Sequence, residues 1–214
     1  MSKLRPINRK TASLPTVRRL PAYLQVVRQA EEEGMTVISG TVIAEELDLE
    51  PIQVRKDLAV TGIVGKPRVG YVVKDLSAAL EKFLRWDVAH NVILVGAGNL
   101  GSALLGHTDF RKNGMNIIAA FDSDPRKVGQ KLHGIMVYDY KIIDEVIKDK
   151  NVAMAILAIP SHVAQEVATS LIALGIKSLW NFTSVKIKAP EGVKGVLIQK
   201  EDLSSGYAVL SVRS

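Results

Sequence analysis

The stretch VILVGAGNLGSALLGH, residues 92–107, contains the pattern that decides the fold of the larger part of this chain. An apolar run, residues 92–96, leads into Gly-x-Gly-x-x-Gly and then into residues that favour a helix. Such a turn between a buried strand and a helix is typical of a Rossmann domain that binds a dinucleotide. Gly96 would form the tight turn, Gly98 would let the backbone approach the pyrophosphate, and Gly101 would let the helix pack against the sheet.

The end of the next apolar run supplies the expected ribose ligand. Asp122 follows the run 117–121, about 20 residues beyond the glycines, where an acidic residue binds the ribose hydroxyls. A carboxylate there favours NADH and NAD⁺, because it would repel the 2′-phosphate of NADP(H). Asp124 competes for this role, although Pro125 indicates that Asp124 begins the next helix. The candidate cofactor-binding residues are Gly96, Ala97, Gly98, Asn99, Leu100, Gly101, Asp122 and Ser123. The alternative is a glycine-rich turn without a ligand.

Strand-like and helix-like segments alternate after residue 91. Apolar runs at 92–96, 117–121, 152–159 and 177–182 predict strands, and the segments 141–148 and 161–174 predict helices. This alternation favours a mainly parallel, doubly wound sheet with both faces covered. Ligands bind at the carboxyl ends of strands in such sheets, so Pro160, Asn181 and Phe182 are expected near the nicotinamide. The alternative is that these three are ordinary residues at strand ends.

The N-terminal part has a different pattern. A helix is expected over residues 16–33, a short helix opens at Ser39, and a further helix runs from Pro51 to near Gly62. Two short helices joined by a tight turn form a helix-turn-helix. Residues 63–73 contain two β-prone runs around a Gly/Pro turn, which predicts a wing hairpin. A helix over residues 75–86 would connect the two halves.

Cationic and amide side chains make this part a candidate DNA interface. Gln53, Lys56 and Val60 are expected on one face of the helix that begins at Pro51, with Val54, Leu58 and the Ile52 side facing inward. Gln suits adenine and Lys suits guanine, whereas Arg suits phosphate. The first thirty residues carry seven Lys or Arg residues and no acidic residue, which suits a polyanion. The candidate DNA-binding residues are Gln53, Arg55, Lys56, Lys66, Arg68 and Arg18. The alternatives are a charged, solvated helix and a solubilising N-terminal tail.

Composition excludes several function classes. The chain has 214 residues, 47% of them hydrophobic, and a net charge of +6. No apolar run approaches the ~20 residues of a membrane span, and no export signal is expected at the N-terminus. The chain contains no cysteine, so it has no disulfide or thiolate site, and its four histidines lack metal-ligand spacing. We therefore expect a cytoplasmic protein without a metal.

The sequence provides a cofactor pocket without evident catalytic residues. Neither a P-loop nor Gly-x-Ser-x-Gly is present, and no Tyr precedes a Lys by four residues. His162 is the one candidate general base near the crevice, and we interpret it as a residue at a helix start. The chain is therefore predicted not to be an enzyme. The alternative functions are a small NAD-dependent oxidoreductase with an accessory N-terminal domain and a CoA-binding module, against which Asp122 argues.

These segments, taken together, resemble the Rex family of bacterial redox-sensing transcriptional repressors. The resemblance covers nearly the whole chain, in RRLPAYL (18–24), QVRKDL (53–58), VGY (69–71), VGAGNLGSAL (95–104), AAFDSDP (119–125), AIP (158–160), GIKSLWNF (175–182) and EDL (201–203). It implies a homodimer whose winged helices bind a palindromic DNA operator and whose C-terminal domains bind NADH or NAD⁺. It also implies that the terminal helix is swapped onto the partner subunit and that NADH releases the protein from DNA.

The resemblance adds a coupling network and shows departures from the family pattern. Residues matching Gln25, His107 and Asp202 connect the nucleotide to domain orientation in the family, where an arginine is usual at the first and a tyrosine at the second. His107 raises the hypothesis of pH sensitivity, because imidazole titrates near neutrality. The segment after KDL reads Ala59-Val60-Thr61-Gly62 instead of Ser-Tyr-Phe-Gly, and Pro67-Arg68 replaces the usual Arg-Gly of the wing.

The predicted architecture is therefore α/β, with four parts. It begins with a basic arm (1–14) and an N-terminal winged helix-turn-helix domain (15–76). A Rossmann-like NAD(H)-binding domain (77–200) and a C-terminal dimerisation helix (201–214) follow.

Overall fold

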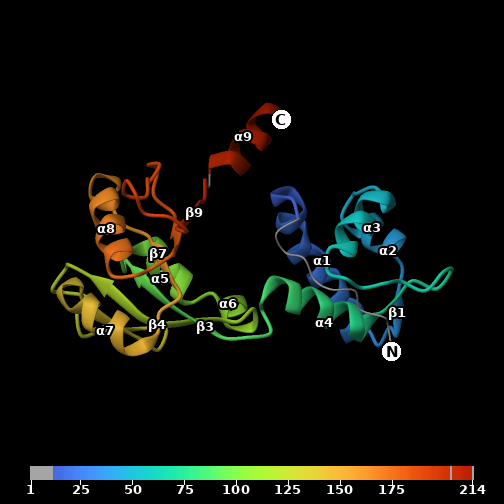
Figure 1. Cartoon of the computed structure of the whole chain (residues 1–214), viewed down its shortest axis with the longest axis horizontal. Helices are drawn as coiled ribbons and strands as arrows, with labels where there is room; N and C mark the ends of the chain where they lie inside the picture. The colour runs from blue at the N-terminus through green and yellow to red at the C-terminus, as the bar shows by residue number, and fades with distance from the viewer. Residues whose placement is uncertain (1–11, 203, 214) are drawn as a thin grey trace. The chain divides into compact units, whose positions relative to one another are not determined.

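The computed structural model describes residues 12–202 and 204–213 of the chain (Figure 1). The chain divides into two compact units, Met1–Val88 and Ala89–Ser214. The predicted basic arm lies mostly outside the described residues. The division falls later than the predicted domain boundary at 76, because the helix α4 (Val73–Leu84) packs into the first unit through Leu76, Leu80 and Phe83.

Over its described residues, 12–88, the first unit contains four helices and a two-stranded ribbon. Ser13 caps α1 (Leu14–Glu32), which contains Pro21, and Ser39 caps the short α2 (Gly40–Glu46). Pro51 begins α3 (Pro51–Ala59), as its fixed φ favours. Leu20, Leu24, Ile43, Val54 and Leu58 are among the side chains that form one apolar core between these helices. The predicted helix-turn-helix is therefore present as α2 and α3.

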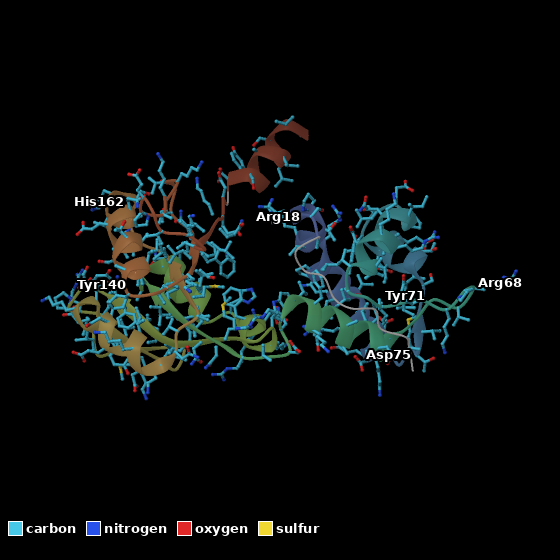
Figure 2. The ribbon with its side chains drawn as sticks, in the orientation of Figure 1. Arg18, Arg68, Tyr71, Asp75, Tyr140 and His162 are labelled. Atoms are coloured by element: carbon cyan, nitrogen blue, oxygen red, sulfur yellow. The ribbon has the colours of Figure 1, made fainter. Side chains whose placement is uncertain are left out.

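The expected wing differs from a regular hairpin. Only Lys66 and Gly70 pair across the turn, with the Lys66 N–H donating to the Gly70 carbonyl at 2.7 Å. The segment 63–65 forms no strand, and β2 (Tyr71–Val72) pairs instead with β1 (Val37–Ile38). Pro67 has no N–H to offer a longer ladder, which limits the pairing. Figure 2 shows Arg68 at the outer end of this loop.

The second unit is built on a seven-stranded sheet with the order β5-β6-β4-β3-β7-β8-β9. Every pairing in it is parallel except that of β5 with β6. The parallel strands are ordered third, second, first, fourth, fifth and sixth along the chain, which is the doubly wound Rossmann order. The strands are β3 (His90–Val95), β4 (Met115–Asp122), β5 (Lys131–Leu132), β6 (Ile135–Asp139), β7 (Met154–Leu157), β8 (Ser178–Asn181) and β9 (Leu197–Lys200). The predicted Rossmann-like sheet is confirmed.

Helices cover both faces of this sheet. Ile93 and Val95 of β3 face a core completed by α7 and α8, whereas Val92 and Leu94 face a second core completed by α5. This alternation reflects the two-residue repeat of a strand that is buried on both sides. The helices of the unit are α5 (Asn99–Leu105), α6 (Thr108–Lys112), η2 (Tyr140–Ile142), α7 (Ile143–Lys150), α8 (Ser161–Ala173) and α9 (Ser204–Arg213).

The last helix, α9, exposes apolar side chains. Tyr207 is 74% exposed and Leu210 is 70% exposed, and Val209 and Val212 are exposed as well. Among the described helices, none is both long and apolar enough to cross a bilayer.

Candidate dinucleotide pocket and DNA interface

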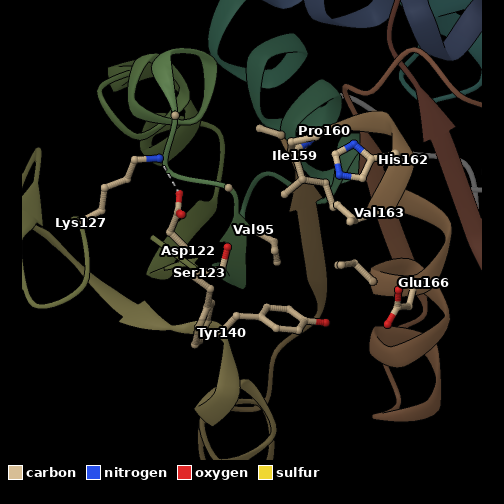
Figure 3. Close-up of a pocket in the computed structure, with 15 residues that line it drawn as sticks. Val95, Asp122, Ser123, Lys127, Tyr140, Ile159, Pro160, His162, Val163 and Glu166 are labelled. Carbon is tan, nitrogen blue, oxygen red and sulfur yellow. Dashed lines mark hydrogen bonds and ion pairs between the residues drawn. The ribbon is translucent and has the colours of Figure 1, made fainter. Parts of the chain in front are cut away.

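A cavity of about 640 Å³ lies at the carboxyl ends of β3, β4 and β7 (Figure 3). It therefore lies where the strand order reverses, between β3 and β7, which is the position at which open α/β sheets bind ligands. Of the predicted cofactor-binding residues, five line it, namely Gly96, Gly98, Asp122, Ser123 and Pro160.

The three positions of the turn are glycine for different structural reasons. Gly96 has a φ of +99°, and a Cβ there would collide with the Ala158 carbonyl. A Cβ on Gly101 would collide with the Gly96 carbonyl, so this glycine lets α5 approach the strand. A Cβ on Gly98 would meet nothing within 4 Å. Packing therefore requires Gly96 and Gly101, whereas Gly98 keeps a space open before the first turn of α5. That the pyrophosphate of a dinucleotide lies in this space stays a prediction.

Asp122, the predicted ribose ligand, lines the cavity as part of an ion pair. Its Oδ2 accepts from the Ala97 N–H at 2.8 Å and from Lys127 Nζ at 2.9 Å, and its Oδ1 accepts from the Asp124 N–H at 2.9 Å. Burial would raise the pKa of Asp122, but these three donors outweigh it and lower the pKa. The carboxylate is therefore charged at neutral pH. Lys127, which lines the cavity, was not predicted from the sequence, because one lysine after a turn carries no distinctive signal.

The far side of the cavity is formed by η2 and α8. Tyr140, Val163 and Val167 line it together with His162 and Glu166, and Figure 3 shows the Tyr140 hydroxyl directed toward α8. Burial raises the pKa of Tyr140, so its ring stays a neutral, largely apolar wall. His162 and Glu166 are exposed residues of the first turns of α8. Among the described residues, no cluster of three His, Asp or Glu side chains has the geometry of a metal site.

The two residues predicted at the end of β8 do not line the cavity. Asn181 is fully buried, and its amide accepts from the Thr183 N–H and hydroxyl and donates to the Val185 carbonyl. Its groups therefore hold the turn that follows β8. Phe182 packs at 4.8 Å against Trp180, which in turn lies 5.5 Å from Phe110 between ring centres. A nicotinamide contact by either residue stays a prediction.

The predicted coupling residues lie in three separate places. His107 stacks on Phe110 at 4.4 Å, at one end of the row of rings that includes Trp180. Asp202 accepts from the Ser204 hydroxyl and, at 3.0 Å, from the Ser204 N–H at the start of α9. The hydrogen bond from the hydroxyl, followed by that from the N–H, lowers the pKa of Asp202. Gln25 lines a groove of about 350 Å³ in the first unit. The role of these residues in coupling stays a prediction.

The helix α3 presents an exposed stripe formed by Ile52, Arg55, Lys56 and Ala59. Val54 and Leu58 face the core as expected, but the expectation that Ile52 faces inward was wrong, since it is 61% exposed. Gln53 is half-buried, and its amide nitrogen donates to Asp57 Oδ1 at 3.0 Å. The predicted phosphate contacts Lys66, Arg68 and Arg18 are all exposed.

A buried carboxylate, which sequence reasoning missed, positions α3 on α1. Asp57 is 1% exposed and accepts from the Thr16 hydroxyl, the Arg19 guanidinium, the Tyr23 hydroxyl and the Gln53 amide at 2.7–3.0 Å. Burial would raise its pKa, but these hydrogen bonds lower it, and burial beside Asp57 raises the pKa of Tyr23 to about 12. The available signal was spacing, since Asp57 shares the inward face of α3 with Val54 and Leu58.

Curated relatives match nearly the whole chain. The redox-sensing transcriptional repressor Rex of Treponema denticola is 52% identical over 203 residues, which cover 95% of each chain. Rex of Bacteroides fragilis is 37% identical over 92% of this chain and 88% of its own. This chain belongs to the Rex family of redox-sensing transcriptional repressors. Two family models match as well, a putative DNA-binding protein N-terminus at residues 12–59 and a CoA binding domain at 87–185.

Solved Rex-family structures share this fold along the chain. The repressor RSP in complex with β-NADH is 32% identical, with a TM-score of 0.84 over 95% of this chain and 94% of its own. RSP in complex with β-NAD⁺ and operator DNA is 33% identical, with a TM-score of 0.86 over 94% and 92% of the two chains. The named relatives are regulators of transcription, in agreement with the predicted resemblance.

Proposed function

We propose that this Rex-family chain is a transcriptional repressor that binds operator DNA through its first unit and senses the NADH/NAD⁺ ratio through its second. The observation that carries the proposal is the open space at Gly98 next to the charged Asp122, because packing does not require a glycine there. The same chain presents Arg55 and Lys56 on the exposed face of a helix-turn-helix.

The nucleotide is proposed to lie across the carboxyl ends of β3 and β7. The segment 96–101 would hold the pyrophosphate, and Asp122 and Ser123 would bind the adenosine ribose. Tyr140, Val163 and Pro160 line the cavity. The apolar wall of Tyr140 and Val163 would suit the adenine ring, and Pro160 would lie toward the nicotinamide. These residues bind and orient the nucleotide without transferring a hydride, so we propose no enzymatic activity and no metal.

DNA binding is proposed to use α3 and the wing loop. Lys56 and Gln53 would contact base edges, whereas Arg55, Lys66, Arg68 and Arg18 would contact phosphates or the minor groove. A homodimer would present two such units to a palindromic operator. The exposed apolar side chains of α9 support a dimer in which this helix covers the partner subunit. Since its partner is operator DNA, we place the protein in the cytoplasm.

Two conformations are required, one that can bind DNA and one that cannot. NADH must have the higher affinity for the conformation that cannot bind DNA. A hundredfold loss of DNA affinity corresponds to about 2.7 kcal/mol of differential binding, which lies within ordinary allosteric coupling. NAD⁺ would bind without this preference.

Fluorescence anisotropy of a labelled duplex tests the proposal. The duplex is selected with the purified protein from a pool with a randomised palindromic core, and it is then titrated with NADH and with NAD⁺ at fixed salt. We expect release by NADH and not by NAD⁺, without consumption of NADH. Binding that ignores both nucleotides would contradict redox sensing.

A matched variant separates the two sites. Lys56→Ala should abolish duplex binding while it leaves the Kd for NADH unchanged, because Lys56 is exposed and belongs to the other unit. Loss of both activities together would indicate misfolding and would contradict the assignment of Lys56 to DNA.

A further inference from the structure

The exposed face of α3 is not purely polar. Ile52, Arg55, Lys56 and Ala59 are spaced i, i+3, i+4 and i+7, so they form one stripe along the helix. Ile52 is 61% exposed in the first turn, and it is the one large apolar side chain exposed on the described face of this helix. The core is completed without it, since Val54 and Leu58 already fill the inward face.

The charges around Ile52 select the kind of partner. Arg55 and Lys56 lie one turn further along the same stripe, and both are exposed. Two exposed cations on one stripe favour a polyanionic partner such as DNA. In a helix-turn-helix, the first residues of the second helix contact base edges in the major groove. The apolar group that DNA presents in that groove is the C5-methyl group of thymine.

Gln53, the residue beside Ile52, is held differently. Its amide nitrogen donates to the buried Asp57, and the side chain is half-buried. Ile52 is therefore more exposed than Gln53, whose amide is engaged within the unit.

We propose that Ile52 is a specificity-determining residue of the repressor and contacts a thymine methyl group in each operator half-site. The proposal rests on the proposed DNA-binding function and adds an apolar base contact to it. The first turn of α3 would thus read a thymine through packing, next to the base contact of Lys56. Loss of one methyl contact corresponds to roughly a fourfold loss of affinity, from the transfer free energy of one buried methyl-sized group.

The test is a double-mutant cycle in which the Ile52 side chain and the thymine methyl group are removed separately and together. A duplex is selected from the randomised pool with the wild-type chain, and each thymine of one half-site is replaced in turn by deoxyuridine, which lacks only the methyl group. We expect one thymine position at which the wild-type chain loses about fourfold in affinity. Ile52→Ala should bind the thymine duplex more weakly and should not distinguish thymine from deoxyuridine at that position.

A control variant and a stability measurement distinguish loss of the contact from loss of folding. Val37→Ala truncates an exposed apolar residue of β1 outside the stripe and should keep the full response to deoxyuridine. The thermal unfolding midpoint of Ile52→Ala should equal that of the wild type, because the side chain lies outside the core. The proposal is overturned if no thymine position is sensitive, or if Ile52→Ala keeps the sensitivity. If the wild-type chain enriches no duplex from the pool, the proposed DNA binding is contradicted, and the proposed contact of Ile52 is contradicted with it.

Discussion

Asp57 is the residue that most constrains the first unit. It lies in the buried face of α3 and is held by donors from two helices, Thr16, Arg19 and Tyr23 on α1 and Gln53 on α3. Arg19 is 30% exposed, so the cost of losing the carboxylate comes mainly from the buried hydroxyl donors of Thr16 and Tyr23, which would lose their charged acceptor. Asp57 therefore helps to position α3 on α1, and with it the exposed stripe of α3.

Asp57→Asn should lower the free energy of unfolding by about 2 kcal/mol at pH 7, because buried donors lose a charged acceptor. The folded-state pKa of Asp57 is lowered, so its contribution is present above the ordinary value of 3.8 and is lost as the pH falls through the folded-state pKa. Urea unfolding at pH 7 and at steps below pH 4 would measure both effects. The control is Asp87→Asn at an exposed residue, which should change neither the free energy of unfolding at pH 7 nor its dependence on pH. An Asp57→Asn variant as stable as the wild type would contradict this role.

The Asp122–Lys127 pair predicts how the pocket selects its nucleotide. Asp122→Asn removes the charge that repels a 2′-phosphate but leaves Lys127 next to it, so NADPH should gain on NADH by about tenfold. In Asp122→Asn/Lys127→Met the gain should be smaller, because the ammonium that attracts the 2′-phosphate is absent while the repelling carboxylate is still gone. Titration calorimetry with both nucleotides gives the ratio of Kd values. Equal ratios in the single and double variants would show that Lys127 does not face the ribose.

At the scale of the element, the turn between β3 and α5 contains one glycine that packing requires and one that packing does not require. Gly101 is required by the close approach of α5 to the Gly96 carbonyl, whereas Gly98 borders open space. The two glycines look equivalent in the sequence pattern, but they act through different contacts.

Gly98→Ala and Gly101→Ala form a matched pair. Gly98→Ala should keep the thermal unfolding midpoint within a few degrees and weaken NADH binding at least tenfold, because the new methyl group occupies the pyrophosphate space. Gly101→Ala should lower the free energy of unfolding by about 1–3 kcal/mol, as overpacking does. Thermal unfolding and NADH titration of both variants separate the effects. A Gly98→Ala variant with unchanged NADH affinity would show that the pyrophosphate does not lie there.

At the scale of the whole molecule, α9 is notable for its exposed apolar side chains. Its apolar residues Tyr207, Val209, Leu210 and Val212 are exposed, and an exposed apolar patch of this kind marks an interaction site. The proposed homodimer would cover it.

Leu210→Glu should therefore shift the chain toward the monomer, because a buried carboxylate at the dimer contact would be left without a partner. Light scattering across a range of protein concentrations would show this as a lower mass at low concentration. Leu197→Glu, at an equally exposed residue of the edge strand β9, is the matched control and should leave the mass unchanged. A Leu210→Glu chain with the wild-type mass would contradict dimerisation through α9.

Sequence alone predicted a doubly wound, mainly parallel sheet, the helix-turn-helix and Asp122 at the end of a strand, because these depend on local periodicity and on glycines at fixed spacing; the order of the strands came from the structure. Sequence reasoning missed β5, β6, β9 and α6, which are short or lie toward the edges of the sheet, where burial leaves little apolar pattern. Tertiary structure alone decided that Ile52 faces outward, that Asn181 holds a turn and that Asp57 joins α1 to α3. It also brought Lys127 to the pocket. The physical reason is that each of these depends on a partner distant in sequence or on which face of an element is already filled, and a local pattern contains neither.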